Sequence, residues 1–540
     1  MYHRHIHIFQ KMKMNMTRGS CCVIMLMMHM HIIMWVDMIE LAEGGRIGIN
    51  WGRTSSQKMM PSMVVDLLLQ NEIKEVRIFN PSGNVLEAFT GTRGQLAVSI
   101  SIPNDHFYKV NTTENALQWV DNWITTFKQR IDMRYVIVGN EPFSVSFADK
   151  THENSVGIQE MVQNAINVRN YGMEIKVSTP QYTDMLNVHL NTTLKPSEAE
   201  FLPQYTDMMT AYLRLLQKNK APVMLNLSPL QYVQENNLDI NFAFMDKKSS
   251  YIVRDNNGLV YDNAFEFLYD SFLWAMKKSG FDDMKLVVTQ IGWPTDALQV
   301  GTVPNAERFY GSLLPYIAST RGTPLKPGLN VDVFLHSLSD ENKLSLDWGP
   351  FQRHWGIYQF NGEPKFRIDF TGKGREIWPS IARGFTYMPT RWCIFNGDMR
   401  DNKTVSGEVD KCCNLADCST LKEGGSCSHL DYKQKVSYAF NRYFQTTVTN
   451  QTDICYMKGF GEIVYKDPSD GRCSFPIEII AAERKQRLDE FLGERSTSDD
   501  PEEYYPAAAS VPRGNMVLQF TILIFLPLLI IYWQPILSLN

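Results

Sequence analysis

The stretch Arg134–Gly139, which reads RYVIVG and runs directly into Asn140 and Glu141, decides the fold. It is a short, almost wholly apolar run that ends in a glycine, an amide and a carboxylate. A short apolar run bounded by a turn signal is typical of a strand buried on both faces of a parallel sheet. The residues directly after such a strand lie at its carboxyl end, where barrel enzymes hold their chemistry.

Seven further short runs of this kind occur along the first two thirds of the chain: Arg46–Asn50, Glu75–Phe79, Gln95–Ser101, Glu174–Thr179, Val223–Leu227, Lys285–Gln290 and Val331–His336. Apolar residues at helical spacing lie between them, most clearly over Pro61–Gln70, Ala116–Phe127 and Asp262–Met276. Eight strand and helix units over residues 45–370 predict a (β/α)8 TIM barrel. A doubly wound parallel sheet is the alternative that the pattern leaves open.

The composition narrows the classes of protein. The chain has 540 residues, of which 44% are hydrophobic and 21% charged, so it is globular. The net charge of −5 and the lack of a long basic run predict that no nucleic acid is bound. His3, His5 and His7 lie in a segment that we expect to be removed, so we predict no metal site and no cofactor. We expect a monomer.

The amino-terminal end has the pattern of a secretory signal. Residues 1–20 contain four Lys or Arg and no acid, and the apolar run Cys21–Val36 follows. Small residues then occur at Ala42 and Gly44. This order predicts a signal peptide over residues 1–44 with a long basic region. A short membrane anchor is the alternative.

The carboxyl-terminal end has the order of a glycosylphosphatidylinositol (GPI) signal. An acidic segment, Ser496–Tyr505, precedes small residues that are candidates for lipid attachment: Ala507, Ala508, Ala509 and Ser510. A spacer, Val511–Asn515, and the apolar run Met516–Trp533 follow. We predict a stalk over 477–510 and a removed signal over 511–540, with the protein held through its lipid on the extracellular face of the plasma membrane and in the cell wall. A transmembrane helix is the alternative.

The cysteines divide the chain. Two of the nine lie in the expected signal, none lies between residues 23 and 392, and seven lie between Cys393 and Cys473. This distribution predicts a disulfide-stapled domain over 391–476, joined to the barrel by a linker over 371–390. Candidate glycosylation sequons begin at Asn111, Asn191, Asn226, Asn402 and Asn450, in weak support of secretion.

Glu141 is the strongest candidate for chemistry, although a glutamate here could instead cap the next helix or pair with an arginine. A carboxylate at the mouth of a barrel is the group that a glycosidase uses as general acid. A retaining glycosidase needs a second carboxylate about 5 Å away as nucleophile. The opposite strand end carries Gln290, whose neutral amide is a poor nucleophile. Asp296 and Asp340 are the carboxylates that could substitute.

The sequence resembles the plant endo-1,3-β-glucanases of glycoside hydrolase family 17. The resemblance rests on Arg46–Gly52, Ile175–Thr179, Val138–Glu141, Gly292–Pro294 and the stretch around Asp340–Asn342. It implies a barrel that cleaves 1,3-β-glucan (callose) with retention, using Glu141 as acid/base and the position of Gln290 as nucleophile. The resemblance implies that the substrate-binding residues are Asn50, Asn80, Asn140, Ser228, Trp293 and Glu341. The chain departs from the family at Gln290 (normally Glu), Asn80 (normally Asp) and Ser228 (normally aromatic).

The cysteine-rich segment resembles carbohydrate-binding module family 43. The matching segments include Trp392–Cys393, Gly424–Cys427 and Ser437–Asn441. The resemblance implies a small, mostly helical domain that binds 1,3-β-glucan, with the pairs Cys393–Cys455, Cys413–Cys418 and Cys427–Cys473. Cys412 is left over, either free or paired between molecules.

Two functions follow from these observations. One is an endo-1,3-β-glucosidase that hydrolyses callose at the plant cell surface, with turnover limited by Gln290. The other is a non-catalytic, lectin-like wall protein that binds 1,3-β-glucan.

Overall fold

The computed structural model describes residues 44–144, 154–446 and 451–480. Four predicted features lie outside these ranges: the signal peptide except for Gly44, most of the stalk, the anchor signal with its candidate attachment residues, and the sequon at Asn450. Among the described residues, no helix is both long and apolar enough to cross a membrane.

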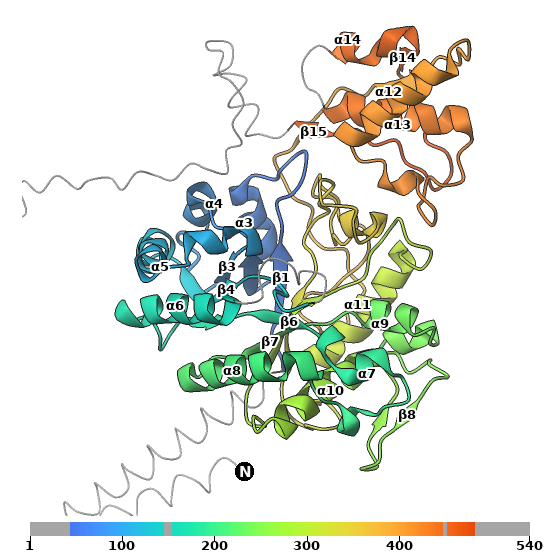
Figure 1. The fold of residues 1–540 in the computed structure, drawn as a ribbon. Coiled ribbons are helices and arrows are strands. Elements are labelled where there is room, and N and C mark those ends of the chain that lie inside the picture. The colour runs from blue at the N-terminus through green and yellow to red at the C-terminus, as the bar shows by residue number, and fades with distance from the viewer. Residues whose placement is uncertain (1–43, 145–153, 447–450, 481–540) are drawn as a thin grey trace, which may run out of the picture. The chain divides into compact units, whose positions relative to one another are not determined.

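The first domain is a closed parallel barrel (Figure 1). Its strands are β1 Ile47–Trp51, β2 Glu75–Ile78, β3 Ala97–Ile102, β4 Asp132–Val138, β5 Lys176–Ser178, β6 Pro180–Tyr182, β7 Val223–Asn226, β10 Leu286–Ile291 and β11 Asp332–Leu335. They are hydrogen-bonded in the order β5-β4-β3-β2-β1-β11-β10-β7-β6, all in parallel. Only Thr179 separates β5 from β6, so the two ends of this order are one interrupted strand. The sheet therefore closes with eight strand positions, which confirms the predicted barrel and excludes the doubly wound alternative.

Helices and turns connect the strands, and Figure 1 shows helices such as α3, α5, α6 and α8 around the outside. The α-helices are α3 Pro61–Gln70, α4 Gly83–Ala88, α5 Thr113–Val120, α6 Ser155–Val168, α7 Asn187–Leu190, α8 Pro203–Asn219, α9 Pro229–Glu235, α10 Ala264–Lys278 and α11 Val303–Ala318. The other turns are η1 Asn104–Lys109, η2 Asp121–Thr125, η5 Thr183–Met185, η6 Pro196–Glu198, η7 Ile240–Ala243 and η8 Pro350–Arg353, and a hairpin pairs β8 Val253–Arg254 with β9 Val260–Tyr261.

Capping residues explain where the predicted helices differ from the observed ones. The helix predicted over Pro61–Gln70 is found with those bounds. The helix expected from Ala116 begins earlier, because the Thr112 side chain accepts a hydrogen bond from the Asn115 N–H and caps α5. Similarly, the Asn263 side chain accepts from the Glu266 N–H, so α10 begins after it. Apolar spacing locates a helix face, whereas the cap sets its end.

Alternate strand residues fill the barrel interior. An interior apolar cluster is formed by Tyr135, Ile137, Met224, Val287 and Phe334, from four strands. Gly48 makes room for this layer, because a Cβ there would lie 2.8 Å from the Phe334 ring. Two residues further along, where strands turn the same face inward, the layer becomes polar and includes Arg77 and Asn226. This polar layer forms the floor of the candidate site.

The second domain is small and mostly helical, as expected. Its elements are β12 Thr386–Tyr387, β13 Trp392–Phe395, α12 Asn402–Leu415, η9 Ser419–Leu421, α13 Tyr432–Thr446, α14 Gln451–Cys455, η10 Met457–Gly459, β14 Gly461–Val464 and β15 Ile479–Ile480. Strands β13 and β14 pair antiparallel. Strand β15, at the start of the segment that we predicted to be a stalk, pairs with β12 in the predicted linker.

The three disulfides implied by the resemblance are confirmed: Cys393–Cys455, Cys413–Cys418 and Cys427–Cys473. Cys412 is unpaired and fully buried, with its Sγ 3.9 Å from the Met457 Sδ. Burial raises the pKa of its thiol to about 12. A buried thiol of this kind favours the free state over a bridge between molecules.

Candidate functional site

The turn after β4 aims Glu141 at the barrel mouth. Gly139 and Glu141 both have a positive φ, at 74° and 50°. Glycine is required at the first position, because a Cβ there would lie 2.6 Å from Asn104 Oδ1. That same oxygen accepts the Asn140 N–H at 2.8 Å, while Asn104 Nδ2 donates to the Asn140 carbonyl at 3.0 Å. The Glu141 N–H donates to the Pro180 carbonyl, so neighbouring strands fix the turn.

Asn226, the last residue of β7, joins the two predicted catalytic positions. Its Nδ2 lies 2.6 Å from Glu141 Oε1 and 2.6 Å from Gln290 Oε1, and 3.2 Å from Asn140 Oδ1. Thr289 fixes the orientation of this amide, because its hydroxyl donates to Asn226 Oδ1 at 2.8 Å. The nitrogen therefore faces the carboxylate and the glutamine. We call Asn140, Glu141, Asn226, Thr289 and Gln290 the mouth cluster.

The mouth cluster has the spacing of a retaining glycosidase. Because Glu141 Oε1 and Gln290 Oε1 each lie 2.6 Å from one nitrogen, they are at most twice that distance, 5.2 Å, apart. Carboxyl groups about 5–5.5 Å apart are typical of retention, whereas inversion needs about 6.5–9.5 Å. A shift in the register of β10 between Val288 and Gln290 lets the consecutive residues Thr289 and Gln290 both reach Asn226.

The environment of Glu141 suits a general acid. Burial raises the pKa of its carboxyl to about 7, and the hydrogen bond from Asn226 opposes the rise. The carboxylate of Asp184 raises this pKa further, while the charge of Arg77 lowers it. A carboxyl that titrates near neutral pH can both give and take a proton in one catalytic cycle.

Arg77 is a site residue that the sequence predictions missed. It is fully buried in β2, and its Nε donates to Ser101 Oγ at 3.0 Å and its Nη2 to Asn140 Oδ1 at 3.2 Å. Burial lowers the pKa of its guanidinium to about 9, which the nearby Glu141 partly offsets. Burial, followed by the charge of Arg77, lowers the pKa of His336 to about 4, so this histidine is neutral. The position of Arg77 inside a mostly apolar strand run was the feature of the sequence that could have identified it as a site residue.

Four of the other predicted binding residues surround the mouth cluster or lie at neighbouring strand ends. Asn50 is buried and its Nδ2 donates to the Thr289 carbonyl at 2.9 Å, which ties β1 to the cluster. Glu341 lies over Gly52, where a Cβ would meet its carboxyl at 2.0 Å, and accepts the Thr54 N–H at 2.9 Å. Asn80 is partly buried after β2. Ser228 caps α9 by accepting the Gln231 N–H at 3.4 Å.

The prediction that Trp293 is exposed in the cleft as a sugar-binding platform is wrong. Trp293 has no exposed surface, stacks on Phe244 with ring centroids 4.6 Å apart, and donates from Nε1 to the Val300 carbonyl. Proximity to the end of β10 suggested a cleft residue, but packing beneath α11 takes the ring into the core. Asn226 is likewise no glycosylation site, because it is buried within the mouth cluster.

The two carboxylates proposed as substitute nucleophiles are held by other partners. Asp340 accepts Lys365 Nζ at 2.5 Å and the Gly356 N–H at 2.9 Å. Asp296 accepts the Ala297 N–H at 2.6 Å. Of the three candidates, Gln290 is the one that shares a hydrogen-bond donor, Asn226, with Glu141.

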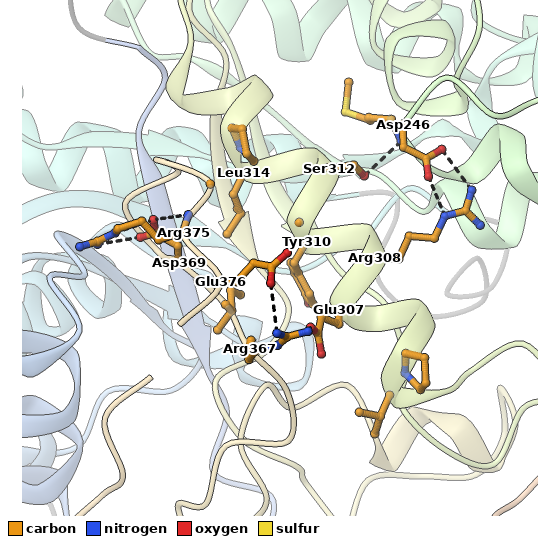
Figure 2. A pocket seen from close by; sticks show the side chains of 17 residues that line it. Asp246, Glu307, Arg308, Tyr310, Ser312, Leu314, Arg367, Asp369, Arg375 and Glu376 are labelled. Atoms are coloured by element: carbon orange, nitrogen blue, oxygen red, sulfur yellow. Dashed lines mark hydrogen bonds and ion pairs between the residues drawn. The ribbon is translucent and has the colours of Figure 1, made fainter. Parts of the chain in front are cut away.

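A separate pocket lies along the outer flank of the barrel, between α11 and residues 367–376 (Figure 2). Each of its three arginines is already ion-paired: Arg308 with Asp246, Arg367 with Glu307 and Glu376, and Arg375 with Asp369. We assign it no role in the chemistry. No group of three or more candidate metal ligands occurs within the ranges that the structure describes.

A closed barrel that holds the Oε1 atoms of Glu141 and Gln290 within 5.2 Å of each other has the geometry of a retaining glycosidase, and sequence comparison agrees with that class. The model of glycosyl hydrolases family 17 matches residues 47–370, and the X8 domain model matches residues 391–462. The chain belongs to glycosyl hydrolase family 17.

Two similar plant proteins match more than four fifths of this chain, and a solved structure matches 60% of it. Glucan endo-1,3-beta-glucosidase 8 of Arabidopsis thaliana is 34% identical over 440 residues, which cover 81% of this chain and 90% of the relative. Glucan endo-1,3-beta-glucosidase 5 of the same plant is 33% identical over 454 residues, covering 83% and 90%. Among solved structures, a β-1,3-glucanase and pollen allergen of Cryptomeria japonica superimposes with a TM-score of 0.56 at 28% identity, covering 60% of this chain and 99% of its own.

Proposed function

We propose that this chain is an endo-1,3-β-glucosidase in which Glu141 is the acid/base and the residue at position 290 decides turnover. The observation that carries the proposal is the pair of 2.6 Å contacts from Asn226 to Glu141 and Gln290. The names and family of the relatives support 1,3-β-glucan as the substrate.

The residues at the mouth can protonate the leaving group but lack a carboxylate nucleophile at position 290. The protonated Glu141 gives its proton to the glycosidic oxygen, and its pKa of about 7 keeps the acid form populated at neutral pH. A retaining enzyme then needs a carboxylate to attack the anomeric carbon, and a neutral amide oxygen does this poorly. As encoded, the barrel therefore binds and protonates its substrate but turns it over slowly.

The chemistry at position 290 also favours a second function, a glucan-binding wall protein. All three disulfides of the X8 domain are formed, so its scaffold is complete. In this case the barrel and the X8 domain both bind 1,3-β-glucan. Under either function we propose a secreted protein, held by a GPI anchor on the extracellular face of the plasma membrane and in the cell wall, where callose is available.

Reducing-sugar release from linear 1,3-β-glucan tests the proposal on the encoded chain, Gln290→Glu and Glu141→Gln. Glucan binding is measured on the same samples. We expect binding by all three proteins and rapid hydrolysis by Gln290→Glu. Rapid hydrolysis by the freshly made encoded chain would favour another nucleophile, and binding without hydrolysis by Gln290→Glu would favour the wall-protein function.

A further inference from the structure

The side-chain amide of Gln290 has the surroundings of a substrate carbonyl in a hydrolytic enzyme: a hydrogen-bond donor on its oxygen and a carboxylate nearby. Its Oε1 accepts a hydrogen bond from Asn226 Nδ2 at 2.6 Å. The Thr289 hydroxyl donates to Asn226 Oδ1 and so fixes the orientation of the Asn226 amide. The Oε1 atom of Glu141 lies within 5.2 Å of the Oε1 atom of Gln290. Gln290 is also partly exposed, unlike its neighbours Val288 and Thr289, so water reaches it.

We propose that Gln290 is a self-modification site, at which Glu141 directs a water molecule onto the side-chain amide and converts the glutamine to glutamate. The significance of the product rests on the proposed function, because glutamate is the residue that a retaining glucosidase needs at this position. The encoded chain would then be a precursor that completes its own catalytic pair after folding.

The reaction consumes one water and releases one ammonia. Glu141, as carboxylate, takes a proton from water while the water oxygen bonds to Gln290 Cδ. The negative charge that develops on Oε1 is stabilised by the Asn226 N–H. The Cδ–Nε2 bond then breaks, Glu141 returns the proton to the departing nitrogen, and ammonia leaves. No oxidation or reduction occurs.

The same residues supply both catalytic effects. A positioned general base contributes about 10²–10⁴ in rate. One oxyanion donor contributes about 10²–10³. Because Glu141 must be ionised, the rate is expected to rise with pH and level off above its pKa of about 7. Among the described residues, Arg77, Asp184 and Tyr182 interact electrostatically with this carboxyl, and its pKa of about 7 already includes the effects of Asp184 and Arg77.

Gln299 provides an internal reference for the rate at which Gln290 converts to glutamate. Cleavage after Lys285 and Arg308 yields one peptide, residues 286–308, that holds both Gln290 and the exposed Gln299. The full chain is incubated in ¹⁸O water after purification, and fragment masses assign any conversion to one glutamine or the other. We expect Gln290 to convert at least about 100-fold faster than Gln299, with ¹⁸O incorporated.

Two variants distinguish this mechanism from spontaneous deamidation. Glu141→Gln should reduce the conversion of Gln290 to the rate of Gln299. Thr289→Val, which releases the amide of Asn226 without altering that residue, should slow conversion about 10-fold or more. Equal rates at the two glutamines, or conversion unaffected by Glu141→Gln, would overturn the inference.

The outcome is separate from that of the proposed function. If Gln290 persists while the Gln290→Glu variant hydrolyses glucan, self-modification is wrong and the proposed function stands. If Gln290 converts while Gln290→Glu leaves glucan intact, self-modification stands and the proposed function is wrong.

Discussion

The barrel mouth and the X8 domain differ in how closely their residues follow the families that they resemble. In the X8 domain, each of the six cysteines implied by the family resemblance is present and paired. In the barrel, the strands are all present, whereas Gln290 and Ser228 stand at positions where the family resemblance implies a glutamate and an aromatic residue. A barrel is stabilised by its interior and by its helices, so its mouth can change without loss of the fold. In the small domain, three disulfides reinforce two small apolar clusters, so the fold depends on its cysteines.

The largest effect is expected at the acid/base. In a Gln290→Glu background, we expect Glu141→Gln to lower the rate of glucan hydrolysis about 10²–10⁴-fold, because protonation of the leaving oxygen is lost. Initial rates on linear 1,3-β-glucan measure the effect. The exposed Glu114→Gln is the matched control and should retain full activity. A loss below 10-fold would remove Glu141 from the catalytic role.

The next effect tests the other region. Replacing both Cys393 and Cys455 by serine should destabilise the X8 domain by about 2–5 kcal/mol, since it opens a loop of 62 residues. Glucan binding by this domain should fall, while hydrolysis of a short soluble substrate by a Gln290→Glu barrel should persist. Two-stage thermal unfolding measures the change. Loss of the barrel transition as well would show that the two regions are not independent.

The pH dependence of stability gives a smaller effect. The folded protein holds the Glu141 proton more tightly than the unfolded chain does, because burial raises the pKa from 4.5 to about 7. This contribution is fully present below pH 4.5 and is lost as pH rises through 7. Glu141→Gln should therefore stabilise the protein at pH 8, by at most about 3 kcal/mol, and have little effect of this origin at pH 4.

Urea unfolding at the two pH values measures this difference. Glu114→Gln again serves as the control, because it removes an exposed carboxyl on α5. An equal effect of Glu141→Gln at both pH values would mean that the carboxyl does not titrate differently in the folded state.

The smallest effect concerns Cys412. We expect Cys412→Ala to cost about 1 kcal/mol, because it removes one buried sulfur from the core. The native thiol should resist alkylation until the domain unfolds. A covalent dimer that disappears in Cys412→Ala under non-reducing electrophoresis would contradict the buried, free thiol.

The fold was more predictable from the sequence than the site. All eight strand runs were found, because a buried parallel strand leaves a continuous apolar signal. The continuation of Lys176–Ser178 into Pro180–Tyr182 was missed, since proline is unusual within a strand. The three disulfides were predicted from the resemblance rather than from spacing.

Within the site, Glu141 was found because it follows an apolar strand directly. The role of Asn226 was missed, since the sequence Asn-Leu-Ser is equally a glycosylation signal, and only the closed barrel brings this amide to Glu141. Trp293 was placed at the cleft because sequence position gives the end of a strand but not the direction of a side chain. Contacts with residues elsewhere in the fold decide both cases, with Glu141 and Gln290 for Asn226 and with Phe244 for Trp293.

The most direct test of the account is the rate of glucan hydrolysis by the freshly made encoded chain relative to its Gln290→Glu variant. We predict that the variant is at least about 10³-fold faster, because a carboxylate replaces a neutral amide where the nucleophile must stand. Equal rates for the two proteins, both abolished by Glu141→Gln, would contradict the account and require another group to attack the anomeric carbon.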